Sequence, residues 1–405
     1  MKALRSVDSA LAQLRGTARA IERTEWVSLD KSLGRVLSQS IKAAIHLPPA
    51  DNSAMDGYAV RCSDFTDNDD KWFPVSQRIP AGTAPTELAP FSVARIFTGG
   101  QIPRGADAII IQEHATEDGE RVRFSNLPRP GNHVRRRGQD LSPGDLIAPQ
   151  GVRIDPAHIS QIAAAGIRDV QVYAPLRVAI VTTGSELVEP GSPLQRGQIY
   201  NSNAYLLASL LEQCGVDVVA RATVEDDYED SIDVLRSCAD QADMVISCGG
   251  VSVGEEDHVK AAVSALGRLD MWRLAIKPGK PMAFGQINDA VFFGLPGNPV
   301  SVFVTFAICV KPYLQTMQGM PWRDYNQRPI RANFSRSANE TRQEYLRVRI
   351  THGADGEEQL EEYATQDSSV TSSIAWADAL AIVPIGQTVE TGDRLQTISF
   401  EHIYS

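Results

Sequence analysis

The pattern of hydrophobic and polar positions changes character several times along the chain, and each change predicts a different kind of structure. At the N-terminus, Ser6 can cap a helix that places Ala10, Leu11 and Leu14 on one face. A second, shorter helix is predicted over about residues 30–38.

Between about residues 46 and 145, prolines and glycines are frequent and the apolar runs are short. The runs at 94–97, 108–111 and 121–124 are typical of strands, so this stretch is predicted to be a β-rich module. It is followed by a predicted helix over 154–165, with Asp155 as its cap and Pro156 in its first turn.

From residue 177 onward, short β-branched runs alternate with longer stretches of helical period. The predicted strands cover 177–181, 216–222, 244–247 and 290–295, and the predicted helices cover 203–214, 230–239, 257–266 and 299–314. This alternation predicts a doubly wound, parallel α/β sheet. After about residue 321, strand-like runs at 329–335, 345–350, 379–383 and 395–400 indicate a small β-barrel or sandwich.

Composition limits the class of partner. The chain has 405 residues and a net charge of −11, which argues against a general nucleic-acid binder. The basic run at 135–137 fits a solvated turn as well as a functional patch. We expect a cytoplasmic protein with buried free thiols: the five cysteines have no metal-ligand spacing, the N-terminus has no signal-peptide core, and the longest apolar run, 300–310, is too short to cross a membrane.

Three glycine-rich loops, each directly after an apolar run, carry the first functional signal. They cover residues 247–254, 277–281 and 295–301. Glycines let backbone N–H groups approach a ligand, and such loops at strand ends suit anions, above all phosphates. In the middle loop, Lys277 and Lys280 flank a Pro-Gly pair and can converge on one anion. The alternative is a surface turn with solvated lysines.

The third loop also predicts the start of a helix. Asn298 and Pro299 are good helix-start residues, which directs N–H groups and the positive end of the dipole at the loop, and Ser301 adds a hydroxyl. A plain helix cap is the alternative.

Acidic residues occupy the corresponding positions after other strands. Glu186, Asp226 and Asp257 are all predicted near strand carboxyl ends, where carboxylates beside phosphate-binding loops usually hold Mg²⁺. Each also fits an N-cap or first-turn acid, and for Asp226 the two interpretations are almost equally supported.

Read together, the motifs resemble one family. Six segments occur in the order and spacing of the molybdopterin molybdenumtransferase family, which includes bacterial MoeA and the E domain of gephyrin. These segments are 52–60, 138–140, 183–187, 247–254, 276–281 and 295–301. The segments 342–347 and 366–369 match more loosely, and Ser185 stands where many relatives carry an acid.

The resemblance implies a multidomain homodimer. Its αβα domain, with a MogA-like fold, would cover 1–25 and 175–325, a small linker domain 26–45 and 146–174, a β-rich inserted domain 46–145, and a C-terminal β-barrel 326–405.

The resemblance also implies an activity. Such a protein inserts molybdenum from molybdate into adenylylated molybdopterin, with Mg²⁺-dependent release of AMP. Its partners would be a second copy of the chain, the molybdopterin adenylyltransferase and other proteins of the cofactor pathway, with no nucleic acid and no membrane.

Roles follow by matching motifs. Glu186, Asp226 and Asp257 would bind metal and ligand, or position the attacking water. Lys277, Lys280 and Ser301 would hold molybdate or the pyrophosphate-like link. Asp56 and Asp140 would complete the cleft from the partner chain, although without the resemblance both would be ordinary turn aspartates. The expected ligand-binding set is Thr183, Gly184, Gly249, Gly250, Ser252, Gly254, Pro281, Gly297, Asn298, Ser301, Arg342 and Ser369.

Two other functions stay open at this point. The αβα domain alone also resembles the molybdopterin adenylyltransferase, and gephyrin-type E domains also serve as non-catalytic scaffolds. The inserted and C-terminal domains favour the molybdenumtransferase, and the retained acids and lysines argue against a pure scaffold.

Overall fold

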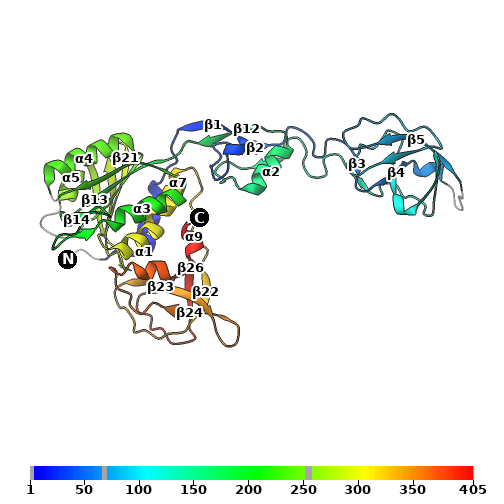
Figure 1. The fold of residues 1–405 in the computed structure, drawn as a ribbon. Helices are drawn as coiled ribbons and strands as arrows, with labels where there is room; N and C mark the ends of the chain where they lie inside the picture. The colour runs from blue at the N-terminus through cyan, green and yellow to red at the C-terminus, as the bar shows by residue number, and fades with distance from the viewer. Residues whose placement is uncertain (1–3, 66–70, 226, 251–257, 405) are drawn as a thin grey trace. The chain divides into compact units, whose positions relative to one another are not determined.

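The computed structural model describes residues 4–65, 71–225, 227–250 and 258–404. The chain forms two compact units (Figure 1): unit 1 contains residues 1–25, 34–38 and 172–405, and unit 2 contains residues 26–33 and 39–171. The predicted division into four domains is finer than this and stays a prediction.

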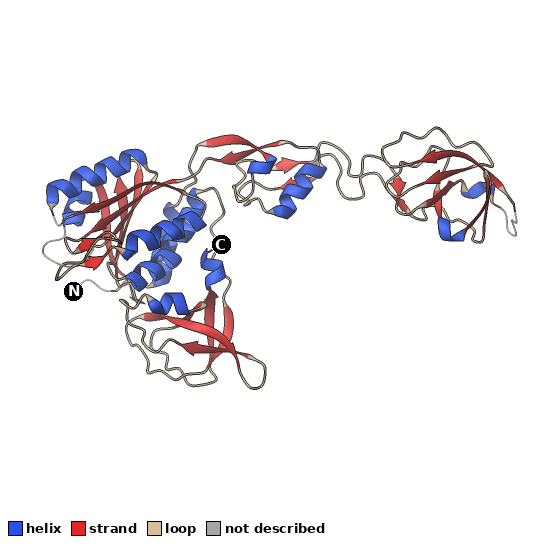
Figure 2. Ribbon diagram, in the orientation of Figure 1, coloured by secondary structure: helices blue, strands red, loops and turns tan. Residues whose placement is uncertain are grey.

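A six-stranded sheet forms the centre of the αβα domain in unit 1 (Figure 2). Its strand order is β16 (Asp217–Val224), β13 (Arg177–Thr183), β17 (Met244–Cys248), β21 (Ala290–Leu295), β20 (Pro281–Ile287) and β18 (Gly267–Arg273). The first four strands are parallel, as predicted, whereas β20 and β18 continue the sheet antiparallel, which the sequence pattern did not predict. A two-stranded parallel ribbon, β14 (Leu187–Val188) with β15 (Ile199–Tyr200), follows β13.

Helices cover both faces of this sheet, because alternate residues of each strand point to opposite sides. Val178 and Ile180 of β13 pack in the cluster that contains α1 (Val7–Thr17), α3 (Ser202–Gln213) and α6 (Pro299–Thr305). Ala179 and Val181 pack in the cluster with α4 (Tyr228–Gln241) and α5 (His258–Leu266). Ser6 caps α1 as predicted, accepting a hydrogen bond from the Ser9 N–H at 3.2 Å.

The helix that begins at α6 continues through a π-helical turn, η4 (Phe306–Val310), into α7 (Lys311–Met317). In the described chain, Pro299–Met317 is one helix long and apolar enough to cross a membrane. It is 89% buried inside the protein, and a core helix of a soluble protein passes the same test.

A closed barrel of five strands forms the C-terminal part of unit 1. In order around the barrel these are β23 (Gln343–His352), β24 (Glu358–Glu362), β22 (Arg328–Ala332), β26 (Arg394–Ser399) and β25 (Ala379–Val383), and pairing of β23 with β25 closes it. Two short helices, α8 (Ser372–Trp376) and α9 (Phe400–Tyr404), accompany the barrel. The short strand β19 (Ile276–Lys277), from the αβα domain, pairs parallel with β23 and so joins the two parts of unit 1.

Unit 2 is β-rich, as predicted. Its largest sheet has the order β7 (Ala108–Ile111), β4 (Gly57–Val60), β6 (Val93–Ile96), β5 (Phe73–Ile79), β9 (Arg121–Phe124) and β8 (Ala115–Asp118). Two smaller sheets pair β3 (Asn52–Ser53) with β10 (Val134–Arg135) and β2 (Ile41–Lys42) with β11 (Leu146–Ala148). Strand β1 (Thr24–Ser28) pairs with β12 (Asp169–Tyr173), and both strands contain residues of each unit. Helix α2 (Pro156–Ala164) starts at the predicted Asp155 cap, and 3₁₀ turns cover Cys62–Asp64 (η2) and Gln112–His114 (η3).

The predicted helix over about 30–38 is wrong. Only a 3₁₀ turn, η1 (Leu29–Lys31), forms there. Gly34 follows with φ +77°, a left-handed backbone that ends any helix. Val36 and Leu37 are still buried, so the sequence correctly indicated that these two side chains face the interior, but it wrongly assigned them to a helix.

Candidate functional site

The glycine-rich loops converge on one cavity of about 630 Å³ in unit 1, which we call the loop cavity. Parallel strands of one sheet end at the same edge, so loops far apart in sequence meet there. Twelve residues expected from the sequence line it: Thr183, Gly184, Glu186, Gly249, Gly250, Lys277, Lys280, Pro281, Gly297, Asn298, Ser301 and Arg342. Ser369 is not among the lining residues, although its hydroxyl donates to Asp367, which is.

Two glycines on the wall are needed for space. At Gly249 (φ +95°) a Cβ would lie 2.7 Å from the Thr183 hydroxyl, and at Gly279 (φ +111°) it would lie 2.5 Å from Cγ2 of Thr305. Both backbones are left-handed, and any side chain would also push the neighbouring residue away. Gly249 therefore lets the loop after β17 approach the end of β13, and Gly279 lets the loop after β19 approach helix α6.

Three cations on the cavity wall differ in how their charge is compensated. Lys277 donates to Glu344 at 2.6 Å. In the described part of the chain, the side chains of Lys280 and Arg342 have no hydrogen-bond or ion-pair partner. Two unpaired cations beside glycine loops and a helix start can bind an anion.

The start of α6 is organised differently from the prediction. Helix α6 does begin at Pro299, but Asn298 makes no side-chain cap bond. Its amide donates instead to the Ser368 hydroxyl at 2.7 Å, and the Val300 N–H donates to the Ser368 carbonyl at 3.1 Å. The helix start is thus tied to the C-terminal segment, while Ser301, 4% exposed, lines the cavity.

Glu186 is the described member of the predicted magnesium set. Its carboxylate lies beside Gly184 on the cavity wall and has no partner among the described residues, which fits a hard, oxygen-seeking cation. Asp226 and Asp257, and the ligand-binding candidates Ser252 and Gly254, lie outside the described residues. Within the described ranges, no group of three or more His, Cys, Asp or Glu side chains could hold a metal ion.

Asp56 and Asp140 both lie in unit 2. The backbone N–H and hydroxyl of Thr98 donate to Oδ1 of Asp56 at 2.7 and 2.8 Å, and these bonds lower the pKa of its carboxyl. Asp140 is exposed, in the loop that follows β10. In the neighbouring basic run, Arg136 pairs with Asp51 at 2.8 Å, as in an ordinary turn.

The sequence interpretation missed the residues that hold the C-terminal wall of the cavity. Gln366, Asp367 and Ser368 line it, and Arg347 holds their loop by donating to the Asp367 carbonyl at 3.1 Å. Arg347 is 1% exposed; burial, followed by the charge of Arg336, lowers its pKa to about 10. The 366–369 motif was the available signal, but nothing local in the sequence links it to Arg347.

Cys248 is close to the site, but its surroundings disfavour a reactive thiolate. Its thiol is buried against the Pro296 carbonyl, and burial raises its pKa to about 12. The thiolate is the reactive form, so this burial disfavours a nucleophilic role near neutral pH. All five cysteines are free thiols, as expected.

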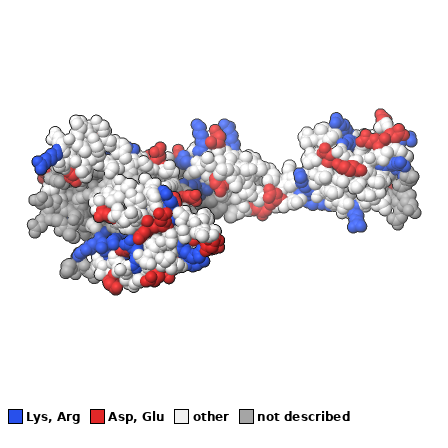
Figure 3. Space-filling model, turned by 60° about the horizontal axis from the view of Figure 1, so that its bottom comes forward, with Lys and Arg blue, Asp and Glu red and all other residues white. Residues whose placement is uncertain are grey.

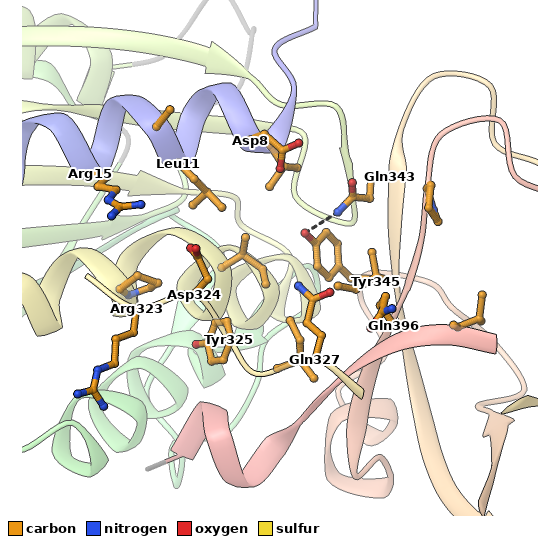
Figure 4. A pocket seen from close by; sticks show the side chains of 18 of the residues that line it. Asp8, Leu11, Arg15, Arg323, Asp324, Tyr325, Gln327, Gln343, Tyr345 and Gln396 are labelled. Atoms are coloured by element: carbon orange, nitrogen blue, oxygen red, sulfur yellow. Dashed lines mark hydrogen bonds between the residues drawn. The ribbon is translucent and has the colours of Figure 1, made fainter. Parts of the chain in front are cut away.

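A second cavity of about 740 Å³ lies on the other side of β23 (Figure 4). Alternate residues of a strand face opposite ways, so Gln343 and Tyr345 point here while Glu344 faces Lys277. Gln343 donates to the Tyr345 hydroxyl at 2.7 Å, and Asp8, Leu11 and Arg15 of α1 complete one wall.

Charge on the surface agrees with the acidic composition. In the view of Figure 3, Lys and Arg side chains gather in one stretch on unit 1 at the lower left, while acidic side chains lie over both units.

Family models match almost the whole chain. "MoeA N-terminal region (domain I and II)" matches residues 5–166, "Probable molybdopterin binding domain" matches 179–316, and "MoeA C-terminal region (domain IV)" matches 329–400.

Curated relatives and a solved structure agree with these models. The molybdopterin molybdenumtransferase of Haemophilus influenzae is 42% identical over 300 residues, which are 73% of this chain and 74% of the relative. That of Bacillus subtilis is 32% identical over 388 residues, 93% of this chain and 89% of the relative. The crystal structure of the molybdopterin biosynthesis MoeA protein of Pyrococcus horikoshii OT3 matches with a TM-score of 0.83 at 26% identity, covering 98% of this chain and 100% of that one.

Proposed function

The chain belongs to the molybdopterin molybdenumtransferase family, a family of transferases in molybdenum cofactor biosynthesis, and from this premise we propose its reaction. It transfers molybdenum from molybdate to adenylylated molybdopterin, and AMP is released in a Mg²⁺-dependent step. The cytoplasm is the proposed compartment, because five free cysteines suit a reducing environment.

The observation that carries this proposal is the loop cavity itself. It brings Lys280 and Arg342, which have no side-chain partner among the described residues, together with Ser301 and the glycine-rich loops around one space of about 630 Å³. That set suits an oxyanion and a phosphate-bearing substrate together. The lysines neutralise negative charge that develops on the departing phosphate.

Mg²⁺ belongs to the proposal through Glu186. If Mg²⁺ binds there, it would supply positive charge that stabilises the negative charge of the phosphate groups. Glu186 supplies one hard oxygen ligand at the cavity wall, and Asp226 and Asp257 are the proposed further ligands.

The test is AMP release from adenylylated molybdopterin by the purified chain, with Mg²⁺ and with or without molybdate. Release that depends on molybdate supports the transferase. No release in either arm, together with turnover of ATP and molybdopterin, favours an adenylyltransferase, and inactivity in every arm favours a scaffold.

We further propose that the chain acts as a homodimer in which Asp56 and Asp140 of one copy serve the loop cavity of the other. The support is chemical: both carboxylates are accessible, and Thr98 fixes Asp56 in its ionised form. Mixing the two inactive variants Asp56→Asn and Lys280→Gln then restores activity, because a mixed dimer contains one intact site. With random exchange, recovery reaches about one quarter of the wild-type rate. No recovery after demonstrated subunit exchange means that both residues act within one chain.

A further inference from the structure

Lys277 lies on the walls of two cavities. One is the loop cavity, and the other is a smaller cavity of about 480 Å³, lined also by residues 335–340, Glu344 and Glu362. On the side of this smaller cavity, Lys277 is therefore close to side chains that the proposed reaction does not use.

Glu344 is the group that meets Lys277 from the rear. Parallel pairing of β19 with β23 places Lys277 directly beside Glu344 in the register, so the strand pairing brings the two side chains together. The Nζ–Oε1 distance is 2.6 Å, and the Glu344 side chain is only 5% exposed. The Lys277 side chain is 36% exposed, so water screens the pair from the lysine side only.

Two further groups fix Glu344 in turn. Asn339 Nδ2 donates to the same Oε1 at 2.9 Å, and Arg336 Nη2 donates to Oε2 at 3.1 Å. Arg336 is itself held by Glu362 at 2.8 Å. Burial alone raises the pKa of Glu344, but the bonds from Lys277 and Asn339 and the nearby positive charges outweigh it, so the carboxyl is ionised with a lowered pKa.

This arrangement singles out one cation of the cavity. Lys280 and Arg342 have no side-chain partner in the described chain, whereas the ammonium of Lys277 is fixed through one of its three donors. A lysine stem has four rotatable bonds, so an unheld ammonium samples many positions. The bond to Glu344 uses one donor of the ammonium and gives it a defined place before the substrate arrives.

We propose that Glu344 is a positioning residue for the transfer reaction: it holds the ammonium of Lys277 at the wall of the loop cavity, and Arg336 and Asn339 hold Glu344. The inference rests on the proposed function and deepens it. It also assigns the C-terminal barrel a part in the reaction, since all three residues lie between β22 and the start of β23.

Loss of Glu344 has two consequences of opposite sign. The ammonium becomes less well placed, which lowers kcat, and a negative charge beside the anion site disappears, which favours anion binding. Glu344→Gln is therefore expected to lower kcat about tenfold while KM for molybdate stays the same or falls. Lys277→Gln is expected to lower kcat and raise KM.

The deciding experiment is a double-mutant cycle with Lys277→Gln, Glu344→Gln and the double variant, measured by AMP release. If Glu344 acts through Lys277, the double variant has the kcat of Lys277→Gln alone. Additive losses, or a rise in KM for Glu344→Gln, overturn the proposal. Glu358→Gln is the matched control, because Glu358 pairs with Arg328 at the surface of the same barrel, and this substitution is expected to leave kcat and KM unchanged.

The same variants distinguish a loss of folding from a loss of the positioning role. Arg336→Gln loosens Glu344 without touching Lys277, so it is expected to give a weaker version of the Glu344→Gln split between kcat and KM. If Arg336→Gln and Glu344→Gln lose activity only in proportion to the folded fraction seen by circular dichroism, with kcat per folded molecule unchanged, the positioning role is wrong. If the folded wild-type chain neither releases AMP nor binds molybdate in calorimetry, the proposed function itself fails, and this inference fails with it.

Discussion

At the amino end of the αβα strands Asp243 is paired with two arginines, whereas at the carboxyl end several charges have no partner among the described residues. Asp243, just before β17, accepts hydrogen bonds from Arg23 at 2.7 Å and Arg177 at 3.0 Å. At the other end, Glu186, Lys280 and Arg342 line the loop cavity without side-chain partners among the described residues.

The difference separates charges that stabilise the fold from charges kept for a ligand. Burial alone raises the pKa of Asp243, but its arginine partners outweigh burial and lower that pKa to about 2. An unpaired lysine contributes little to folding and is retained at a cost, which is usual at functional sites. Substitutions at the carboxyl end should therefore reduce activity more than stability, and those at the amino end the reverse.

The largest expected effect is at Lys280. Lys280→Gln removes an unpaired cation from the loop cavity and is expected to lower kcat/KM for molybdate-dependent AMP release by about 10²–10³. Thermal unfolding should hardly change. The matched control is Lys42→Gln, an exposed lysine of β2 in unit 2, which should leave both quantities as they are. A loss of less than threefold for Lys280→Gln would falsify the anion-site assignment.

The next effect concerns the shape of the same loop. Gly279→Ala forces a side chain onto a backbone with φ +111° and to within 2.5 Å of Thr305, so the loop that carries both lysines must shift. A displacement of about 1 Å can cost about a hundredfold in rate, so kcat should fall by up to that factor. Gly356→Ala is the control, because Gly356 has φ +79° but open space around it, and steady-state kinetics should show no change.

At the amino end the expected effect is on stability. Asp243→Asn removes a paired carboxylate and is expected to lower the free energy of unfolding by about 2 kcal/mol at pH 7, with kcat unchanged. The folded pKa lies below the unfolded one, so the ion pairs stabilise the fold above about pH 4, and this stabilisation is lost as the pH falls toward 2.

Urea unfolding at pH 7 and pH 3 checks this, and the wild-type advantage should shrink at the lower pH. Asp233→Asn serves as the control, because Asp233 is 76% exposed and its pair with Arg236 should contribute little. An Asp243→Asn protein as stable as wild type at pH 7 contradicts the assignment.

The smallest effect is expected at the first helix. Ser6→Ala removes the cap bond to the Ser9 N–H and should lower stability by about 1 kcal/mol without changing activity. Ser6→Asn restores an acceptor and should recover most of the loss in the same unfolding assay. A large activity change in either variant means that Ser6 does more than cap the helix.

Local patterns predicted much of the fold, and particular residues show where this stopped. The Asp155 cap with Pro156, and the alternation along β13, appear in the structure as predicted. The helix over 30–38 failed because Gly34 adopts a left-handed backbone that hydrophobic period does not report. Strands β18 and β20 were missed because they pair antiparallel with each other at the edge of a sheet whose other strands follow the β–α alternation.

The same division holds for the candidate site. Glycine spacing and the family resemblance predicted most of the residues that line the loop cavity. This was possible because the glycines that let a loop approach a ligand belong to the sequence of the loop itself. The residues that support the cavity from behind, Glu344 and Arg347, were not predicted. The sequence does not distinguish a buried glutamate or arginine in a strand from an exposed one, because the contacts of these side chains come from distant parts of the chain.

The sequence by itself determined where glycines, lysines and acids follow strands, and therefore which loops line one cavity at the edge of a parallel sheet. The tertiary structure alone decided which of those charges are paired. Lys277 and Glu344 stand 67 residues apart and meet only because β19 and β23 pair in one register, while Lys280, three residues further along, meets no carboxylate in the described chain. Charge compensation depends on distances between elements that fold together from distant parts of the chain, and no local pattern encodes those distances.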